Sequence, residues 1–335
     1  MRTAADPLDR AVILYERALA VWADHAYPQV VSLCRRALAL FEEHAGPGHP
    51  DVANVLTLLG SAEDELGEYL AAEVRHRRAV AIMQEPIATG GELLRVRISA
   101  CLGLANNLRG QSRYEEAERL YRAVLAQAPD VYEAAELASV HNDLGVLYKF
   151  AGRLDEADAC YAKAYTLMEQ AYGPDHPALA GIFHNLAGLA HSRGRFEEGE
   201  AHARRSLALH LRAYPPGHPA VVADEAHLGA LLQAAGKPDE AEPLLRKAIA
   251  FFTDRYGPNH YEVLVNLHNL AAALADRGEY AEAEAVYRRA LDGKRRTLGP
   301  DHPDVALTLN NLAALTAERG EGEQFRRASR RPWSG

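Results

Sequence analysis

Histidine is the residue of this sequence whose side chain could do the most chemistry, and it occurs 15 times among 335 residues. Imidazole binds zinc and exchanges protons near neutral pH, and carboxylates can share both tasks. The combination is densest around His184, His191 and His227, where Asp224 and Glu225 precede His227. This set is the sequence's candidate for a metal centre or a general acid–base site.

The spacing of these residues argues against both kinds of chemistry. His184 and His191 are seven residues apart, which is about 10 Å along a helix, whereas zinc needs nitrogen ligands at about 2 Å. The HExxH arrangement is absent, as are the GxSxG, GxxxxGK(S/T) and GxGxxG signatures. We therefore predict no catalytic residue, no metal site and no cofactor. A catalytic or metal-binding role for His184, His191, Glu225 and His227 is kept as an alternative.

Five other histidines belong to a repeated phrase. Gly-Pro-x-His-Pro occurs at 46–50, 173–177 and 299–303, with relatives at 216–219 and 257–260. In the full phrase a glycine ends one helix, the histidine caps the next, and proline fits its first turn. Equivalent positions of packed helices lie about 8–10 Å apart, so this series cannot share a metal. We predict structural caps at His49, His176, His218, His260 and His302.

Composition and charge exclude several classes of function. The chain has 46 acidic against 37 basic residues, a net charge of −9, and therefore lacks the basic footprint of a nucleic-acid-binding protein. It has no apolar run long enough to cross a membrane, and its three cysteines lack disulfide or metal spacing. We predict a cytoplasmic protein without nucleic-acid or membrane partners. Cys34 and Cys101 are expected in the helical core, and Cys160 at its edge.

A 42-residue repeat organises the chain. The linker histidines from His176 to His302 recur every 42 residues, and a second marker, usually glycine, lies eighteen residues after each. Counting back one period from Gly67 reaches His25, in a degenerate first copy. Eight copies therefore cover essentially the whole chain. The markers are Gly67, Ser112, Gly152, Gly194, Gly236, Gly278 and Gly320.

Each copy is predicted to form two helices. Apolar residues recur at three- and four-residue spacing over 261–276, Gly278 breaks this helix, and a second begins near Tyr280. The fifth residue after the marker is small, which allows two helices to cross closely. In the end copies Val30 and Phe325 replace it, as expected of caps. The small residues are Ala72, Ala117, Ala157, Gly199, Ala241 and Ala283.

This pattern resembles the tetratricopeptide repeat (TPR), in the 42-residue form of kinesin light chains and similar bacterial proteins. The resemblance rests on strings such as His268-Asn269-Leu270-Ala271, Tyr287-Arg288-Arg289-Ala290-Leu291 and Gly299-Pro300-Asp301-His302-Pro303. It implies an all-α fold, a right-handed α-solenoid of about eight helix-turn-helix units with a concave groove. We predict a single solenoid over 1–325, with copies at 7–45, 46–86, 87–128, 129–171, 172–213, 214–255, 256–297 and 298–325, and a basic tail at 326–335.

The resemblance also implies that first helices line the groove, at positions that can be counted back from each marker. In copies three to six these positions lean basic, with Asp143 as the opposing charge. Asn can donate to and accept from a peptide backbone, while Arg and Lys take a carboxylate. Copies three to five, beside irregular linkers, are the expected binding segment. The predicted ligand-binding residues are Asn106, Arg109, Asn142, Lys149, His184, Asn185, His191, His227, Gln233, His268, Asn269 and Asn311.

One residue departs from its position in the repeat. Glu225 stands where other copies have leucine or phenylalanine. Because a lone carboxylate is costly in a core, we expect its side chain to reach solvent or to be paired, with a histidine as one candidate partner.

The resemblance implies a scaffold or a peptide receptor rather than an enzyme. We predict a non-catalytic adaptor that holds a peptide segment of a partner protein in its groove. Acidic groups in that segment would match the basic central copies, and self-association stays open. A regulatory sensor of a short peptide or small ligand is one alternative, and a catalytic or metal-binding solenoid is the other.

Overall fold

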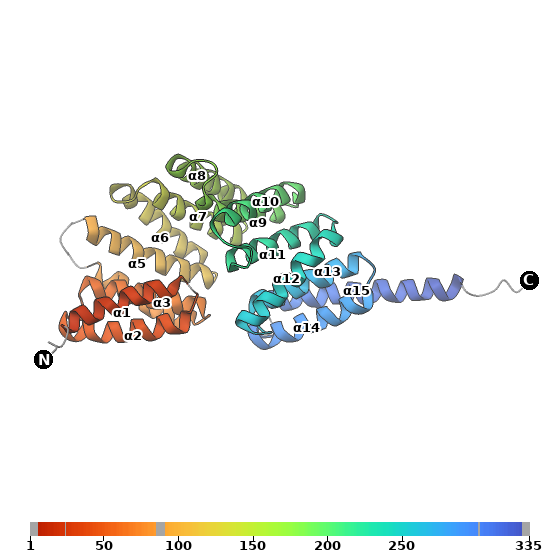
Figure 1. Ribbon diagram of the computed structural model, residues 1–335, viewed down its shortest axis with the longest axis horizontal. Helices are drawn as coiled ribbons and strands as arrows, with labels where there is room; N and C mark the ends of the chain where they lie inside the picture. Colours follow the sequence, from red (N-terminus) through yellow and green to blue (C-terminus); the bar gives the residue numbers. More distant parts are fainter. Residues whose placement is uncertain (1–5, 24, 85–90, 301, 330–335) are drawn as a thin grey trace, which may run out of the picture. The chain divides into compact units, whose positions relative to one another are not determined.

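The structure is a computed structural model that describes residues 6–23, 25–84, 91–300 and 302–329, with side chains up to 317 and for Arg319. Within these ranges the chain forms fifteen α-helices, two short 3-10 turns and no strand (Figure 1). The chain divides into two compact units, residues 1–173 and 174–335. None of the described helices combines the length and the apolar character that a membrane span requires.

The first unit consists of four helix pairs, in which the two helices of a pair pack together and the second helix of each of the first three pairs packs against the first helix of the next. A 3-10 turn, η1 (Ala128–Asp130), follows the third pair. The pairs are α1 (Pro7–Trp22) with α2 (Tyr27–His44), α3 (Pro50–Glu65) with α4 (Tyr69–Ile82), α5 (Gly91–Gly110) with α6 (Tyr114–Gln127), and α7 (Ala134–Phe150) with α8 (Leu154–Tyr172).

The second unit consists of three helix pairs and one final helix. A 3-10 turn, η2 (Pro177–Leu179), leads into its first pair. The pairs are α9 (Ala180–Ser192) with α10 (Phe196–Ala213), α11 (Pro219–Ala234) with α12 (Pro238–Tyr256), and α13 (Tyr261–Asp276) with α14 (Tyr280–Leu298), followed by α15 (Pro303–Ser329).

The markers of the repeat are the left-handed turns between paired helices. Five of the predicted markers are glycines with φ between 70° and 79°. The two non-glycine residues with positive φ among the described residues are His25, with φ 55°, and Ser112, with φ 60°. Both stand where the repeat needs a marker. The period therefore located a backbone conformation even where the residue type no longer signals it.

The five linker histidines are helix caps, as predicted. In each case the Nδ1 atom accepts a hydrogen bond from the backbone N–H two residues later, over 3.1–3.4 Å. This bond satisfies one of the free N–H groups at a helix start, and it requires an unprotonated Nδ1. The linker thus sets the helix starts of η2, α3, α11, α13 and α15.

The small residue after each marker is the contact point inside a pair. The five predicted alanines have no exposed surface. At Gly199 on α10 a Cβ atom would come within 3.2 Å of the Ala187 carbonyl on the paired helix α9, and within 2.7 Å of Leu231 Cδ2 on α11 of the next pair, which explains the glycine there. Val30 was expected to cap an open end, yet it is fully buried. The first copy therefore keeps this position in its core, and Phe325 lies outside the described side chains.

A ladder of ion pairs joins successive copies along their second helices. The residue after each small contact is a half-buried glutamate in five copies, held by an arginine four residues later in its own helix. A second cation comes from the next copy, from a residue beside its marker position. These pairs between copies are Glu73–Arg113, Glu118–Arg153, Glu200–Lys237, Glu242–Arg277 and Glu284–Arg319.

The eighth copy differs from the prediction. A second helix after Gly320 was expected, but α15 continues through Gly320 to Ser329. Residues 321–324 are Glu-Gly-Glu-Gln, which offers no apolar stripe to pack back on α15. The expected tail at 326–335 thus begins inside a helix. The prediction of one solenoid over 1–325 remains a prediction.

We predict opposite effects for two glycine substitutions. In Gly145→Ala the new Cβ would lie 2.6 Å from the Tyr161 ring, which packs on α7 from α8, so the free energy of unfolding should fall by about 1–3 kcal/mol. Gly181→Ala on α9 meets nothing within 4 Å and should raise it by up to about 1 kcal/mol. Urea unfolding followed by circular dichroism measures both. A neutral Gly145→Ala would contradict the close packing described.

Candidate functional site

The predicted ligand-binding residues lie in both units. Those of copies three and four are on α5 and α7 in the first unit, and the others are on α9, α11, α13 and α15 in the second. The side chains of the two groups have different partners.

In the first unit the amides of α5 and α7 converge on one carboxylate. Asn142 and Asn106 both hydrogen-bond to Asp143, and the Asn106 carbonyl accepts the hydroxyl proton of Tyr121 from α6. Burial raises the pKa of Asp143, while Arg109 and the two amides counter that shift. The side chain of Asn106 is therefore fixed by a donor on one side and an acceptor on the other.

Arg109 lies close to this carboxylate and also to a second cation, Lys149. Burial lowers the pKa of Lys149, and the neighbouring charge of Arg109 lowers it further. Among the described residues Arg109 forms no hydrogen bond and no ion pair through its side chain, and Lys149 contacts only the ring of Phe150, at 5.2 Å. Arg109 and Lys149 are thus close enough to repel each other, and neither is paired.

A phenol completes this group. Tyr161 on α8 is fully buried, and its hydroxyl has no hydrogen-bond partner among the described residues. Burial raises the pKa of Tyr161, and the charges of Arg109 and Asp143 also act on it. A buried hydroxyl without a partner costs roughly 1–3 kcal/mol. The half-buried Arg109 and Lys149 are therefore the groups suited to an added anion, and the Tyr161 hydroxyl lies beneath them in the core.

In the second unit a different carboxylate is the hub. Asp224, with 3% of its side chain exposed, lies 3.0 Å from His184 Nδ1 and 2.7 Å from His210 Nδ1. Ser206 Oγ lies 2.8 Å from its Oδ2 atom and 2.9 Å from the carbonyl of Ala180. Burial raises the pKa of Asp224, but the three hydrogen bonds outweigh it and bring the pKa to about 2. The sequence placed Asp224 beside His227 without identifying this role.

The ionised hub decides which histidine nitrogens carry protons. A carboxylate only accepts hydrogen bonds, so the Nδ1 atoms of His184 and His210 are the donors. His227 Nδ1 then lies 3.3 Å from a protonated His184 Nδ1, with the rings 4.3 Å apart. No three His, Cys, Asp or Glu residues within the described ranges converge as a metal site would require. The arrangement is a hydrogen-bonded network rather than a set of open ligands.

Glu225 is paired, but not with a histidine. Its carboxylate lies 2.6 Å from Lys247 Nζ on α12, with 13% of its side chain exposed. The lysine is two positions beyond Leu245, a core residue of the same unit. Its flexible chain reaches the core position that Glu225 occupies, and this explains how a carboxylate is tolerated there.

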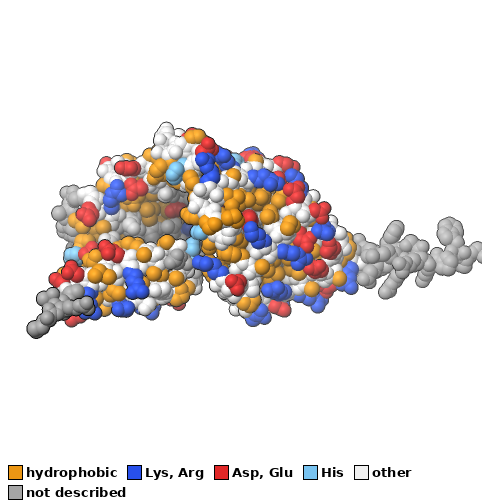
Figure 2. All heavy atoms as spheres, in the orientation of Figure 1, with side chains coloured by type: hydrophobic (Ala, Val, Ile, Leu, Met, Phe, Trp, Pro, Cys, Tyr) orange, Lys and Arg blue, Asp and Glu red, His pale blue; other side chains and the backbone are white. Residues whose placement is uncertain are grey.

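The other predicted residues of the second unit differ in their partners and in their burial. Gln233 donates to Asp276 at 2.9 Å, the His191 ring meets Phe196 edge-on, and Asn185 and Asn269 are half-buried. On the first helices α11 and α13, equivalent positions are occupied by the small residues Ala230 and Ala272, which are half-buried. Figure 2 shows hydrophobic side chains gathered over α11 and α13.

His268 and Asn311 belong to a buried network. His268 is 8% exposed; its Nδ1 lies 3.1 Å from Thr308 Oγ1, and its Nε2 lies 3.2 Å from Asn311 Nδ2. Lys294, 2% exposed, donates to the same threonine and lies 3.8 Å from Asp304. Burial lowers the pKa of His268 to about 4, with a further contribution from Lys294. These contacts join α13, α14 and α15.

Comparison with protein families decides what the repeat is. A profile described as tetratricopeptide repeat matches residues 9–85, 136–212, 178–254, 221–296 and 262–324, and a second profile of the same description matches 97–126. The chain belongs to the tetratricopeptide repeat family. A search of curated protein sequences found no significant match.

Two solved structures with TM-scores above 0.6 share the fold of this chain. The Rap conjugation gene regulator of plasmid pLS20, in complex with the Phr* peptide, is 16% identical, with 84% of this chain and 73% of that chain covered and a TM-score of 0.64. The apo quorum sensor NprR from B. thuringiensis is 16% identical, with 86% and 77% covered and a TM-score of 0.61. TPR-like repeats of a Podospora anserina protein named as a kinesin light chain are 21% identical, with 63% and 99% covered and a TM-score of 0.48.

We predict that Asp224 stabilises the second TPR unit. In Asp224→Asn an amide N–H₂ must face a histidine or serine donor, leaving buried donors unpaired, so the free energy of unfolding should fall by about 2–4 kcal/mol. Asp239→Asn, whose side chain is 85% exposed, is the matched control and should change it by less than about 0.5 kcal/mol. Urea titration measures both. Equal effects would contradict the role of Asp224 as a hub.

His268 should make stability depend on pH. Its pKa is about 4 in the fold against 6.5 for the free side chain, so only the unfolded chain binds the proton between these values. Its contribution is complete above pH 6.5 and is lost as pH falls towards 4, by roughly 2–3 kcal/mol. His268→Gln should flatten this part of the stability profile, whereas His44→Gln, on the surface of α2, should not. If the stability of His268→Gln changed with pH as steeply as that of the wild type, His268 would not be the group responsible.

Proposed function

We propose that this TPR chain is a non-catalytic, cytoplasmic adaptor that binds a peptide segment of a partner protein on α5 and α7. The observation that supports this proposal is the position of Arg109, which lies close to both the half-buried Asp143 carboxylate and the half-buried Lys149, while neither cation forms a salt bridge among the described residues. A second carboxylate would balance the charge and could accept hydrogen bonds from a guanidinium in the planar geometry that arginine favours.

The amides beside these cations support an extended peptide as the ligand. Asn106 and Asn142 bond to Asp143, and a side-chain amide can both donate to and accept from a peptide backbone. A preformed, rigid group of this kind lowers the entropic cost of binding. An acidic side chain or a peptide carboxyl terminus is the ligand group we infer.

A second candidate is a regulatory sensor of a short peptide. It is favoured by the likeness in fold to a regulator solved with the Phr* peptide and to the quorum sensor NprR. The two roles differ in how the protein responds to its ligand. A sensor changes the relation of its helices when the peptide binds, which small-angle X-ray scattering with and without peptide would record, whereas an adaptor keeps one scattering profile.

Charge reversal tests the binding role. A displayed library of random peptides is selected on the wild-type chain, and the selected peptides are measured by fluorescence polarisation. We expect acidic or carboxyl-terminal motifs, and a loss of affinity of about 100-fold or more in the Arg109→Glu, Lys149→Glu double variant.

Arg36→Glu is the matched control, because Arg36 on α2 is exposed and has no ion pair among the described residues. Its affinity should stay within about two-fold of wild type. Unchanged binding by the double variant would refute the carboxylate site, and a selection without enriched peptides would refute peptide binding itself.

A further inference from the structure

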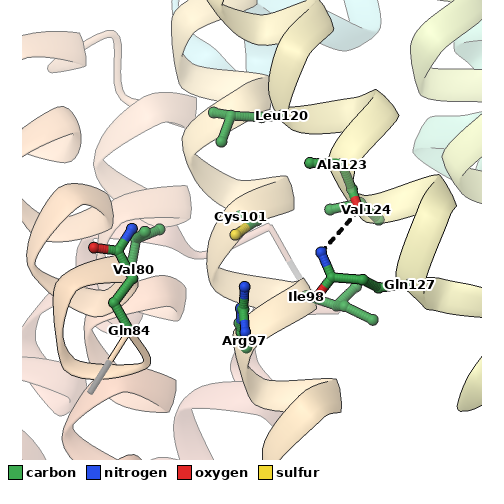
Figure 3. A pocket seen from close by; sticks show the side chains of 9 residues that line it. All are labelled: Val80, Gln84, Arg97, Ile98, Cys101, Leu120, Ala123, Val124 and Gln127. Carbon is green, nitrogen blue, oxygen red and sulfur yellow. Dashed lines mark hydrogen bonds between the residues drawn. The ribbon is translucent and has the colours of Figure 1, made fainter. Parts of the chain in front are cut away.

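The first unit contains a cavity whose lining includes none of the predicted ligand-binding residues. It lies between α4, α5 and α6 and has a volume of about 170 Å³ (Figure 3). The α5 residues that line it, Arg97, Ile98 and Cys101, lie one half-helix before the predicted groove residues Asn106 and Arg109. The cavity is therefore a separate place on the same unit.

The walls of this cavity are apolar, while its mouth is polar. Ile98, Val124 and Val80 are at most 9% exposed, and Leu120 and Ala123 extend the apolar wall along α6. Gln84 and Arg97 are exposed, so the cavity opens to the surface beside them. On the far side Gln127 donates to the carbonyl of Ala123 at 3.0 Å.

Arg97 is the charged group at the mouth, and it has no partner. It makes no hydrogen bond and no ion pair among the described residues, in contrast to Arg95 on the same helix, which pairs with Glu136 and covers the Tyr132 ring. Figure 3 shows the Arg97 side chain below Cys101 in this view. Burial raises the pKa of Cys101, while the charge of Arg97 acts in the opposite direction. Cys101 was predicted to be a buried core residue; it instead forms part of the cavity wall.

We propose that this cavity binds a small amphipathic carboxylate, with its apolar part against Ile98, Val124 and Leu120 and its carboxylate on Arg97. An apolar cavity of about 150 Å³ in a protein holds one benzene molecule, so a single ring or a short alkyl chain fills this volume. The unpaired guanidinium selects an anionic head group over a cationic one. The amide of Gln84 is a further donor at the mouth.

Phenylacetate is a suitable probe, because it joins one ring to a carboxylate, and 2-phenylethanol is its uncharged counterpart of the same shape. Cys101 provides a readout that does not involve peptide binding. In a Cys160→Ser chain, Cys101 is the accessible thiol, since Cys34 is fully buried. Phenylacetate should slow the reaction of Cys101 with iodoacetamide in a saturable way, and 2-phenylethanol should require a concentration about ten-fold higher for the same protection.

Matched variants separate the charge from the cavity. Arg97→Gln should weaken protection by phenylacetate about ten-fold and bring it to the level of 2-phenylethanol. Arg36→Gln, an exposed and unpaired arginine on α2, should leave it unchanged. In a Cys101→Ser chain the rate at Cys160 should not respond to either compound.

Two results would overturn the proposal. Protection that does not saturate, or that appears equally at Cys160, would show that the cavity binds no ligand of this class. Equal protection by phenylacetate and 2-phenylethanol in the wild-type chain would show that Arg97 selects no anion. Peptide binding on α5 and α7 is measured separately, so a failure here leaves that proposal standing.

Discussion

The close crossing of two helices at one small residue is the contact on which six repeats of this chain depend. Five alanines without exposed surface and Gly199 occupy it. A larger side chain would separate the helices, and the left-handed turn five residues earlier would no longer bring the second helix back onto the first. The turn, the contact and the cap recur together because each is useful only when the other two are present.

The same contact explains the polar order outside the core. The residue that follows the small one must point to the edge of the second helix, where the turn of the next copy lies. Glutamate at that position reaches two cations at once, as Glu118 does with Arg122 and Arg153. Exposed ion pairs contribute only about 0.3–1 kcal/mol each, so the ladder does not hold the copies together. Its regularity follows from the packing beneath it.

The sequence predicted the features that repeat and missed those that occur once. Turn positions followed from the period even at His25 and Ser112, and the histidine caps followed from the linker phrase. The long α15 was missed because a marker glycine can also lie inside a helix when nothing beyond it can pack. The partners of Glu225 and Asp224 were missed because they lie on neighbouring helices, and position in the repeat does not identify a side chain's contacts.

Equivalent positions in the two units therefore have different uses. His184 shares a hub that is already saturated, since Asp224 accepts from His184, His210 and Ser206. A ligand there would have to break hydrogen bonds that hold α9, α10 and α11 together. Arg109 and Lys149 are half-buried and form no salt bridge among the described residues, and the one carboxylate close to Arg109, Asp143, cannot balance both charges. A second carboxylate would therefore be favourable there. A carboxylate ligand should therefore bind more favourably at α5 and α7, where charge is not fully compensated, than at the histidine-rich helices.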